Sequence, residues 1–230
     1  MNLRKRHLVG RTRGVIGLEL DSHFFSPKAY RALVNAVPEW TFVDCFELVN
    51  WVRLVKSDAE IQLMRLAARV TTKAMEAALE TIDVGVPQHV VAAEIQRAQT
   101  LGDGDAWGDF PGIVPLLPTG RSSDTPHLTW TDRPFQQDEA VVIELAGAHR
   151  RYHVPSARTV MLGRPSEELE RVEEAAAHGL QQVLDSTLAG VAVGQLAEVW
   201  NFALAEYGLT KPSRLGYSIG IGYPPDWGER

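Results

Sequence analysis

The chain has a single cysteine, fewer basic than acidic residues and no long hydrophobic run. Its 230 residues include one cysteine, Cys45, which excludes an internal disulfide and fits a reducing compartment. The net charge of −6 disfavours general nucleic-acid binding, because binding to phosphates needs clustered Lys and Arg. No apolar run approaches the roughly 20 residues that span a bilayer, and no secretory signal follows the basic residues near the N-terminus. The sequence predicts a cytoplasmic protein without a nucleic-acid or membrane partner.

The composition is that of an ordinary folded protein. Hydrophobic residues make up 45% of the chain and charged residues 23%, which excludes a disordered chain. Cys45 lies among Phe42, Val43 and Phe46, so we expect it to be a buried, small apolar side chain.

Residues 1–53 are expected to form a strand–helix–strand piece. The pattern predicts strands at residues 14–20 and 41–45. It also predicts a helix that begins at Ser26-Pro27 and runs to Ala36, with proline in the first turn, where a helix tolerates it. Such a piece is too small to bury a stable core by itself. We therefore interpret residues 1–53 as the tail of an N-terminal α/β domain that begins upstream.

Residues 57–230 are expected to form an α+β domain. Ser57 and Glu60 make a capping box that opens a helix ending before Gly85-Val86-Pro87, and residues 102–112 read as a loop. The remaining expected elements are helices at 88–101, 165–188 and 194–207, and strands at 113–117, 140–145, 152–162 and 217–223. This order suggests two related halves, the second of which stops after its first strand, so we expect the domain to lack its last part.

Five short motifs are distinctive, and the pattern at Tyr223–Glu229 in the last of them has no explanation in local propensity. They are Lys56–Ile61, Val114–Gly120, Pro126–Trp130, Arg151–His153 and Gly222–Glu229. Together they resemble the ectoine hydrolase branch of the creatinase/prolidase family, and nearly the whole chain can be laid along that family. The resemblance implies a pita-bread fold for residues 57–230, preceded by the tail of a creatinase-like domain. It also implies a homodimer.

The resemblance also implies that the metal site of this family is lost. In metal-dependent members, an Asp and a second Asp eleven positions later bind the metal, the second just before an Arg-Thr pair. The matching positions here are Glu144 and Pro155, and proline has no donor atom. Tyr217 stands where the family has a metal-binding His, and the family's two downstream carboxylates would lie beyond Arg230. We expect neither a metal nor another cofactor.

The activity that this resemblance implies is opening of the cyclic amidine ring of ectoine or hydroxyectoine, which yields an N-acetylated diaminobutyrate. A planar amidinium cation needs a carboxylate in its site, and the substrate carboxylate needs an Arg or backbone amides. Water must be activated by a base, and the departing nitrogen must receive a proton.

Three residues are the catalytic candidates. His127 matches the family's catalytic His and is the candidate base; otherwise it caps a strand. Glu144 would bind the amidinium or act as a second acid or base; otherwise it pairs with Arg158 or faces solvent. Tyr217 would donate a hydrogen bond to a developing charge.

Five residues are the candidates for binding substrate. Arg158 either binds the substrate carboxylate or is a structural partner of Glu144. His153 lines a pocket or ends a strand. Trp130 and Trp227, like Phe110, either wall an apolar pocket or belong to the core, and Tyr223 is a further candidate for binding substrate.

Two other functions stay open at this point. A creatinase or Xaa-Pro peptidase would share the fold, although Pro155 and Tyr217 argue against its metal site. The other alternative is an inactive or ligand-binding fragment, since an incomplete sheet edge invites association.

Overall fold

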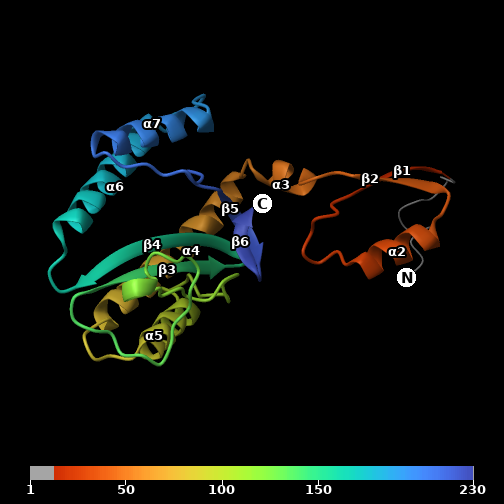
Figure 1. Cartoon of the computed structure of the whole chain (residues 1–230). Coiled ribbons are helices and arrows are strands. Elements are labelled where there is room, and N and C mark those ends of the chain that lie inside the picture. Colours follow the sequence, from red (N-terminus) through yellow and green to blue (C-terminus); the bar gives the residue numbers. More distant parts are fainter. Residues whose placement is uncertain (1–12, 230) are drawn as a thin grey trace. The chain divides into compact units, whose positions relative to one another are not determined.

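The structure is a computed structural model that describes residues 13–229. These residues divide into two units, 13–55 and 56–229, and each is described here by itself (Figure 1).

The first unit is the predicted strand–helix–strand piece, with one further helix. Its two strands pair in parallel, with Gly14 opposite Trp40. The Ser26 hydroxyl accepts a hydrogen bond from Ala29 N at 3.2 Å, so the predicted N-cap is confirmed. The last helix was not predicted, because its six residues are too few to show a periodic pattern. The elements are β1 (Gly14–Leu18), α2 (Pro27–Ala36), β2 (Trp40–Asp44) and α3 (Leu48–Arg53).

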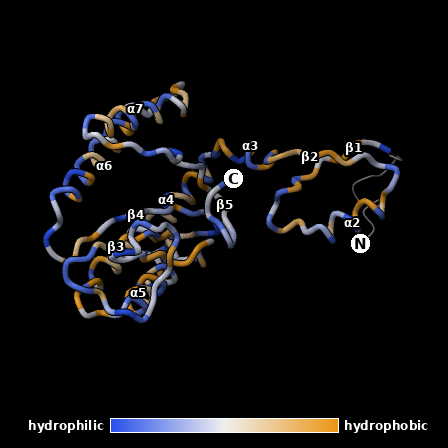
Figure 2. Tube along the Cα trace, in the orientation of Figure 1, coloured by the Kyte–Doolittle hydropathy of each residue, from blue (hydrophilic) through white to orange (hydrophobic). Residues whose placement is uncertain are grey.

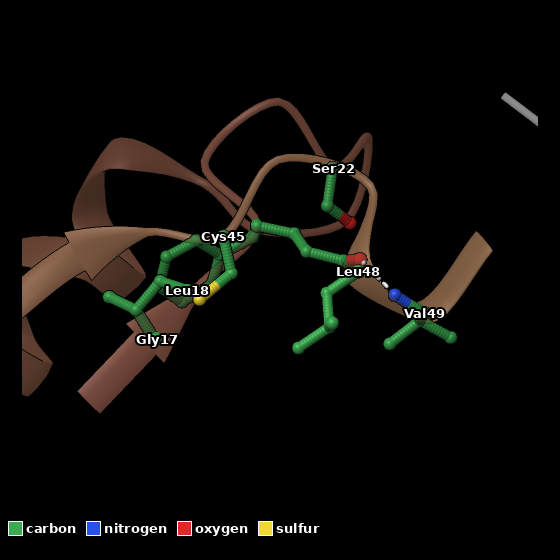
Figure 3. Close-up of a pocket in the computed structure, with 8 residues that line it drawn as sticks. Gly17, Leu18, Ser22, Cys45, Leu48 and Val49 are labelled. Atoms are coloured by element: carbon green, nitrogen blue, oxygen red, sulfur yellow. Dashed lines mark hydrogen bonds between the residues drawn. The ribbon is translucent and has the colours of Figure 1, made fainter. Parts of the chain in front are cut away.

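A pocket of about 320 Å³ lies in this unit, where Gly17 and Leu18 of β1 meet the segment from Cys45 to Val49 (Figure 3). Glu19 closes one side of it, because its carboxylate accepts a hydrogen bond from Val49 N at 2.8 Å. Cys45 is a free thiol that is half-buried, rather than fully buried as predicted. No predicted site residue lines this pocket.

The second unit begins with two packed helices. The predicted capping box at Ser57 is present: Glu60 N donates to the Ser57 hydroxyl, and the Glu60 carboxylate accepts from Ser57 N at 2.8 Å. Figure 2 shows hydrophobic and hydrophilic residues interspersed along these helices, as expected when one side of each is buried. The helices of this unit are α4 (Asp58–Thr81), α5 (Gln88–Leu101), α6 (Glu167–Ser186) and α7 (Val193–Glu206), with a short 3-10 turn, η1 (Gly120–Ser122).

The sheet of the second unit has the order β3-β4-β5-β6 and is antiparallel throughout. A two-residue turn at Arg150 and Arg151, both with positive φ, joins the first two strands. The predicted strand at 113–117 is wrong: this segment makes one isolated bridge, from Leu116 to Glu144 of β3, and a second isolated bridge lies just beyond it, from Thr119 to Val141. Pro115 and Pro118 interrupt a continuous ladder because proline lacks the N–H. The strands are β3 (Glu139–His149), β4 (Tyr152–Leu162), β5 (Ser218–Tyr223) and β6 (Asp226–Glu229), the last of which was not predicted.

The core lies between β3 and the pair α4–α5 (Figure 1). On β3, Val141, Ile143 and Leu145 are fully buried against these helices. Gly147 allows α4 to approach closely, since a Cβ there would come within 2.3 Å of Thr71 N. The Thr71 hydroxyl accepts a hydrogen bond from Gly147 N at 3.0 Å. This packing fixes which face of β3 is turned away from the helices.

Candidate functional site

Glu144 lies on the face of β3 that is turned away from the core. Its neighbours Ile143 and Leu145 are fully buried, whereas Glu144 is half-buried, as the alternation of a strand requires. Its cross-strand partner is Ala157, and Pro155 lies opposite Ala146, so Pro155 and Ala157 share the face of Glu144. Among residues 13–229, the Glu144 carboxylate makes no hydrogen bond or ion pair. It is therefore a carboxylate that a cation could approach.

Arg158 lies on the opposite face of the sheet. It pairs with Ile143, whose side chain points into the core, so the alternative that Arg158 is the structural partner of Glu144 is wrong. Its guanidinium donates to the Ala157 carbonyl at 2.6 Å and to the Ser156 hydroxyl at 3.4 Å, and the side chain is exposed. The predicted role of Arg158 in binding a substrate carboxylate stays a prediction.

His127 is exposed, in the turn that follows η1. Its φ of 64° places it in the left-handed region, which histidine tolerates better than most residues that carry a side chain. Within the described part of the chain its imidazole makes no hydrogen bond, so the alternative that it caps a strand finds no support. Trp130, three residues later, lines a pocket of about 230 Å³ together with Leu117 and Thr131.

Tyr217 and Trp227 meet at the β5–β6 hairpin. The Trp227 indole N–H donates to the Tyr217 hydroxyl at 2.8 Å, and Arg214 stacks on the Tyr217 ring, 5.0 Å from its centroid. Trp227 is only 1% exposed and so belongs to the buried interior, and its predicted role in binding substrate stays a prediction. Tyr217 is 39% exposed, and its hydroxyl hydrogen remains free to donate while its oxygen accepts from Trp227.

A buried ion pair closes the same hairpin. Lys56 Nζ lies 2.5 Å from the Glu229 carboxylate, and the two side chains are 9% and 1% exposed. The Ser218 hydroxyl donates to the same carboxylate oxygen at 2.6 Å, so the pair also holds the first residue of β5. This arrangement joins the start of α4 to the end of β6. It was not predicted.

Arg151 binds the loop at 103–112 to the end of β5. Its guanidinium donates twice to the Gly222 carbonyl, at 3.1 and 2.7 Å, and once to the Phe110 carbonyl. It lies 3.4 Å from the Asp109 carboxylate. The Phe110 and Tyr223 rings both stack on it, at 3.9 and 4.7 Å from their centroids. The predicted substrate-binding residue Tyr223 is therefore positioned by Arg151, and it remains 53% exposed.

His153 is a fully buried, neutral histidine. Its Nε2 accepts a hydrogen bond from Gly112 N at 2.9 Å, so this nitrogen carries no proton. Its Nδ1 then donates to the Arg151 carbonyl at 2.9 Å. Burial lowers the pKa of His153 to about 4, and the hydrogen bond to the Arg151 carbonyl opposes this shift in part. Both ring nitrogens are occupied, so His153 anchors the loop instead of facing a substrate.

The stability of the protein should depend on pH through His153. The unfolded chain protonates this residue near pH 6.5 and the folded chain near pH 4, so the unfolded state binds more protons between these values. The free energy of unfolding should therefore fall by about 3 kcal/mol from this residue as the pH falls from 6.5 to 4. Urea unfolding at a series of pH values measures this change in the free energy of unfolding. His153→Gln should flatten the dependence, and His89→Gln, an exposed control, should keep it.

The structure thus divides the predicted residues among several places. Glu144 lies on the open face of the sheet, Arg158 on the other face, and Trp130 at a separate pocket. His153, Tyr223, Trp227 and Tyr217 belong to the network around β5 and β6. Sequence reasoning missed Arg151, although the motif that contains it pointed to this place in the chain.

The comparisons with known proteins agree with this architecture. A model of metallopeptidase family M24 matches residues 62–227. The chain belongs to this family. A prolidase from Pyrococcus horikoshii OT3 has a TM-score of 0.82 at 22% identity, covering 93% of this chain and 60% of that one. A prolidase from Pyrococcus furiosus has a TM-score of 0.81 at 20% identity, with 93% and 62% covered. The predicted creatinase/prolidase fold is confirmed.

Two relatives extend the comparison at the level of sequence. The chain is 42% identical to an ectoine hydrolase of Halomonas elongata over 223 residues, which are 94% of this chain and 56% of that protein. It is 36% identical to a protein of Sinorhizobium fredii named as an uncharacterized hydrolase/peptidase, with 94% and 55% covered. The chain thus spans slightly more than half the length of these relatives.

The described residues around Glu144 do not supply the side-chain ligands of a divalent metal. Pro155 shares the face of Glu144 and has no donor atom, and His153 uses both ring nitrogens for other hydrogen bonds. Within residues 13–229, no three His, Cys, Asp or Glu side chains lie close enough to hold a metal ion. Nor do these residues include a helix long and apolar enough to cross a membrane.

Proposed function

We propose that this M24 chain belongs to a hydrolase that opens the cyclic amidine ring of ectoine or hydroxyectoine. The observation that carries the proposal is the 42% identity to an ectoine hydrolase over 94% of this chain. The half-buried Glu144 carboxylate supports it, because a planar amidinium needs such a partner and Glu144 has none of its own among the described residues.

In the proposed reaction, water adds to the amidine carbon and one C–N bond of the ring then breaks. The carbon keeps its methyl group and becomes the carbonyl carbon of an N-acetyl group, and the released nitrogen becomes an amine after it takes up a proton. His127 is the proposed base that removes the proton from water. Glu144 would hold the amidinium, and Tyr217 would donate a hydrogen bond to the charge that develops.

We further propose that the reaction needs no metal ion. The support is the set of side chains around Glu144, where proline occupies the place of a metal ligand. A metal-dependent Xaa-Pro peptidase is the second candidate, because the chain is 25% identical to an Xaa-Pro dipeptidase of Pyrococcus horikoshii over 80% of its length. The cytoplasmic location and the homodimer stay predictions. The alternative that the chain is a fragment that binds a ligand without turning it over also stays open.

The test is incubation of the purified chain with ectoine, with and without a chelator, followed by proton NMR. The expected result is a new N-acetyl methyl signal that forms at the same rate in both samples. If the chelator stops the conversion, the proposal of a metal-free reaction is wrong, but the proposal that the protein opens the ring still holds. An absence of both conversion and calorimetric binding of ectoine would overturn the proposed function, and cleavage of an Xaa-Pro dipeptide would favour the second candidate.

A further inference from the structure

Gln88, at the start of α5, is buried and its amide is fixed in one orientation. It is 4% exposed, and its Oε1 accepts hydrogen bonds from Thr131 N at 2.8 Å and from the Thr131 hydroxyl at 3.0 Å. Because a backbone N–H can only donate, the oxygen and not the nitrogen of the Gln88 amide must face Thr131. Its Nε2 group therefore points elsewhere, and within the described residues it has no acceptor.

This donor is open to a ligand. Among residues 13–229, the buried side-chain nitrogens and oxygens without a partner are Gln99 Oε1 and Trp200 Nε1, so solvent reaches Gln88 Nε2, and a water or a ligand can supply its acceptor. Gln88 lines the pocket of about 230 Å³ beside Trp130, far above the roughly 10–15 Å³ that one water needs. The pocket is thus large enough for more than one water, and we call it the Gln88 pocket.

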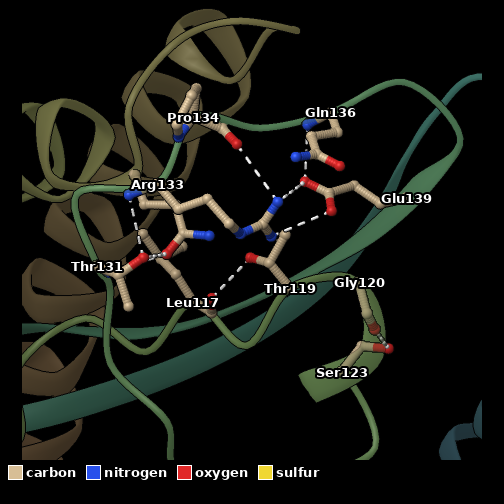
Figure 4. Close-up of polar contacts among 10 residues, drawn as sticks. Leu117, Thr119, Gly120, Ser123, Thr131, Arg133, Pro134, Gln136 and Glu139 are labelled. Atoms are coloured by element: carbon tan, nitrogen blue, oxygen red, sulfur yellow. Dashed lines mark hydrogen bonds and ion pairs between the residues drawn. The ribbon is translucent and has the colours of Figure 1, made fainter.

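The walls of the Gln88 pocket combine apolar groups with hydroxyls. Leu117, Leu128 and Trp130 supply the apolar surface, and Leu117 is only 1% exposed. Thr119 supplies a hydroxyl that donates to the Leu117 carbonyl at 2.8 Å and so keeps its oxygen lone pairs for a donor on a ligand (Figure 4). The pocket offers a fixed donor, a fixed acceptor and an apolar surface.

The charges near the Gln88 pocket are already paired. Arg133 also lines it, and both of its terminal nitrogens contact the Glu139 carboxylate, at 3.2 and 3.1 Å (Figure 4). The Arg133 guanidinium donates as well to the Pro134 carbonyl at 3.3 Å. An ionic ligand would have to leave water without gaining a free counter-charge. This favours a neutral ligand.

We propose that the Gln88 pocket binds a small neutral amide, such as an acetamido group. Its carbonyl oxygen would accept from Gln88 Nε2, its N–H would donate to the Thr119 hydroxyl, and its methyl group would contact Leu117 and Trp130. The proposal does not rest on ectoine hydrolysis. Thr119 is bridged to Val141, whose side chain points into the core, so this site lies on the side of β3 opposite Glu144.

The experiment is a titration of the ¹⁵N-labelled chain with N-methylacetamide, followed by the side-chain amide signals in proton–nitrogen NMR spectra. We expect saturable shifts of the Gln88 amide at millimolar concentrations, which is the affinity that so few ligand atoms can supply. Acetate, which has the same shape but carries a charge, should bind at least about tenfold more weakly.

Gln88→Glu is the sharpest variant, because it keeps an oxygen toward Thr131 and replaces only the donor. It should weaken binding of N-methylacetamide by about tenfold. The matched control is Gln96→Glu on the same helix, whose amide donates to the Ala92 carbonyl; it should bind like wild type. Gln88→Met is a second variant, which removes the N–H donor without adding a charge. Shifts that never saturate, equal binding of acetate, or equal binding by both Gln88 variants would overturn the proposal and leave the pocket to ordered water.

Discussion

Lys56→Met is expected to lower the free energy of unfolding by about 3–5 kcal/mol, because it removes the ammonium that contacts the buried Glu229 carboxylate. The Glu229 side chain is 1% exposed and lies 2.5 Å from Lys56 Nζ, and the neutral Ser218 hydroxyl cannot replace the charge of the ammonium. Urea unfolding followed by circular dichroism measures the change. A loss of this size is a large part of the total stability of an ordinary domain.

The matched control for this prediction is Lys73→Met. Lys73 pairs with Glu76 at 2.7 Å, but these side chains are 47% and 50% exposed, so its loss should change the free energy of unfolding by less than about 1 kcal/mol. The double variant Lys56→Met/Glu229→Leu should recover much of the stability, since it also removes the buried carboxylate. Equal losses in Lys56→Met and Lys73→Met would show that the pair at the hairpin contributes no more than a surface contact.

Local patterns in the sequence predicted the helices well, apart from the six-residue α3. Ser57 and Glu60 define the start of α4 through reciprocal hydrogen bonds between neighbours in the chain, so the pattern contains the whole interaction. The same holds for Ser26 at α2. The strand at 113–117 failed because β-branched and apolar residues there outweighed Pro115 and Pro118 in the prediction.

The face of the sheet on which Arg158 lies is decided by one turn. A two-residue turn at Arg150 and Arg151 fixes the register of β3 and β4, and this register puts Arg158 and Glu144 on opposite faces. Both central residues of such a turn have positive φ, so they are usually Asn or Gly. Arg150 and Arg151 occupy these positions here, and two arginines do not indicate a turn in a sequence. The residues 146–149 were therefore not recognised as a part of β3.

The contacts that organise the candidate site join distant parts of the chain. Arg151 meets Gly222 across 71 positions, and Lys56 meets Glu229 across 173. No periodicity or spacing in the sequence indicates a pair of residues so far apart. The motifs therefore pointed to these regions but did not show which residues contact each other. Family resemblance supplied the fold, whereas the neutral state of His153 and the orientation of Gln88 required coordinates.

His127→Asn is expected to lower kcat for ectoine by about 10²–10⁴, the usual contribution of a positioned base. Asparagine is the suitable replacement because it also tolerates the left-handed conformation of this residue, where φ is 64°. His127 is exposed and its ring makes no hydrogen bond within the described residues, so the free energy of unfolding should change by less than about 0.5 kcal/mol.

Rates of ring opening, measured by proton NMR at saturating ectoine, test this prediction, with His89→Asn as the control for an exposed histidine of the same unit. A role in the chemical step lowers kcat and leaves KM nearly unchanged, whereas a role in binding alone raises KM. Full activity of His127→Asn would remove this residue from the mechanism. Glu144, the half-buried carboxylate on the open face of the sheet, would then be the base to replace next.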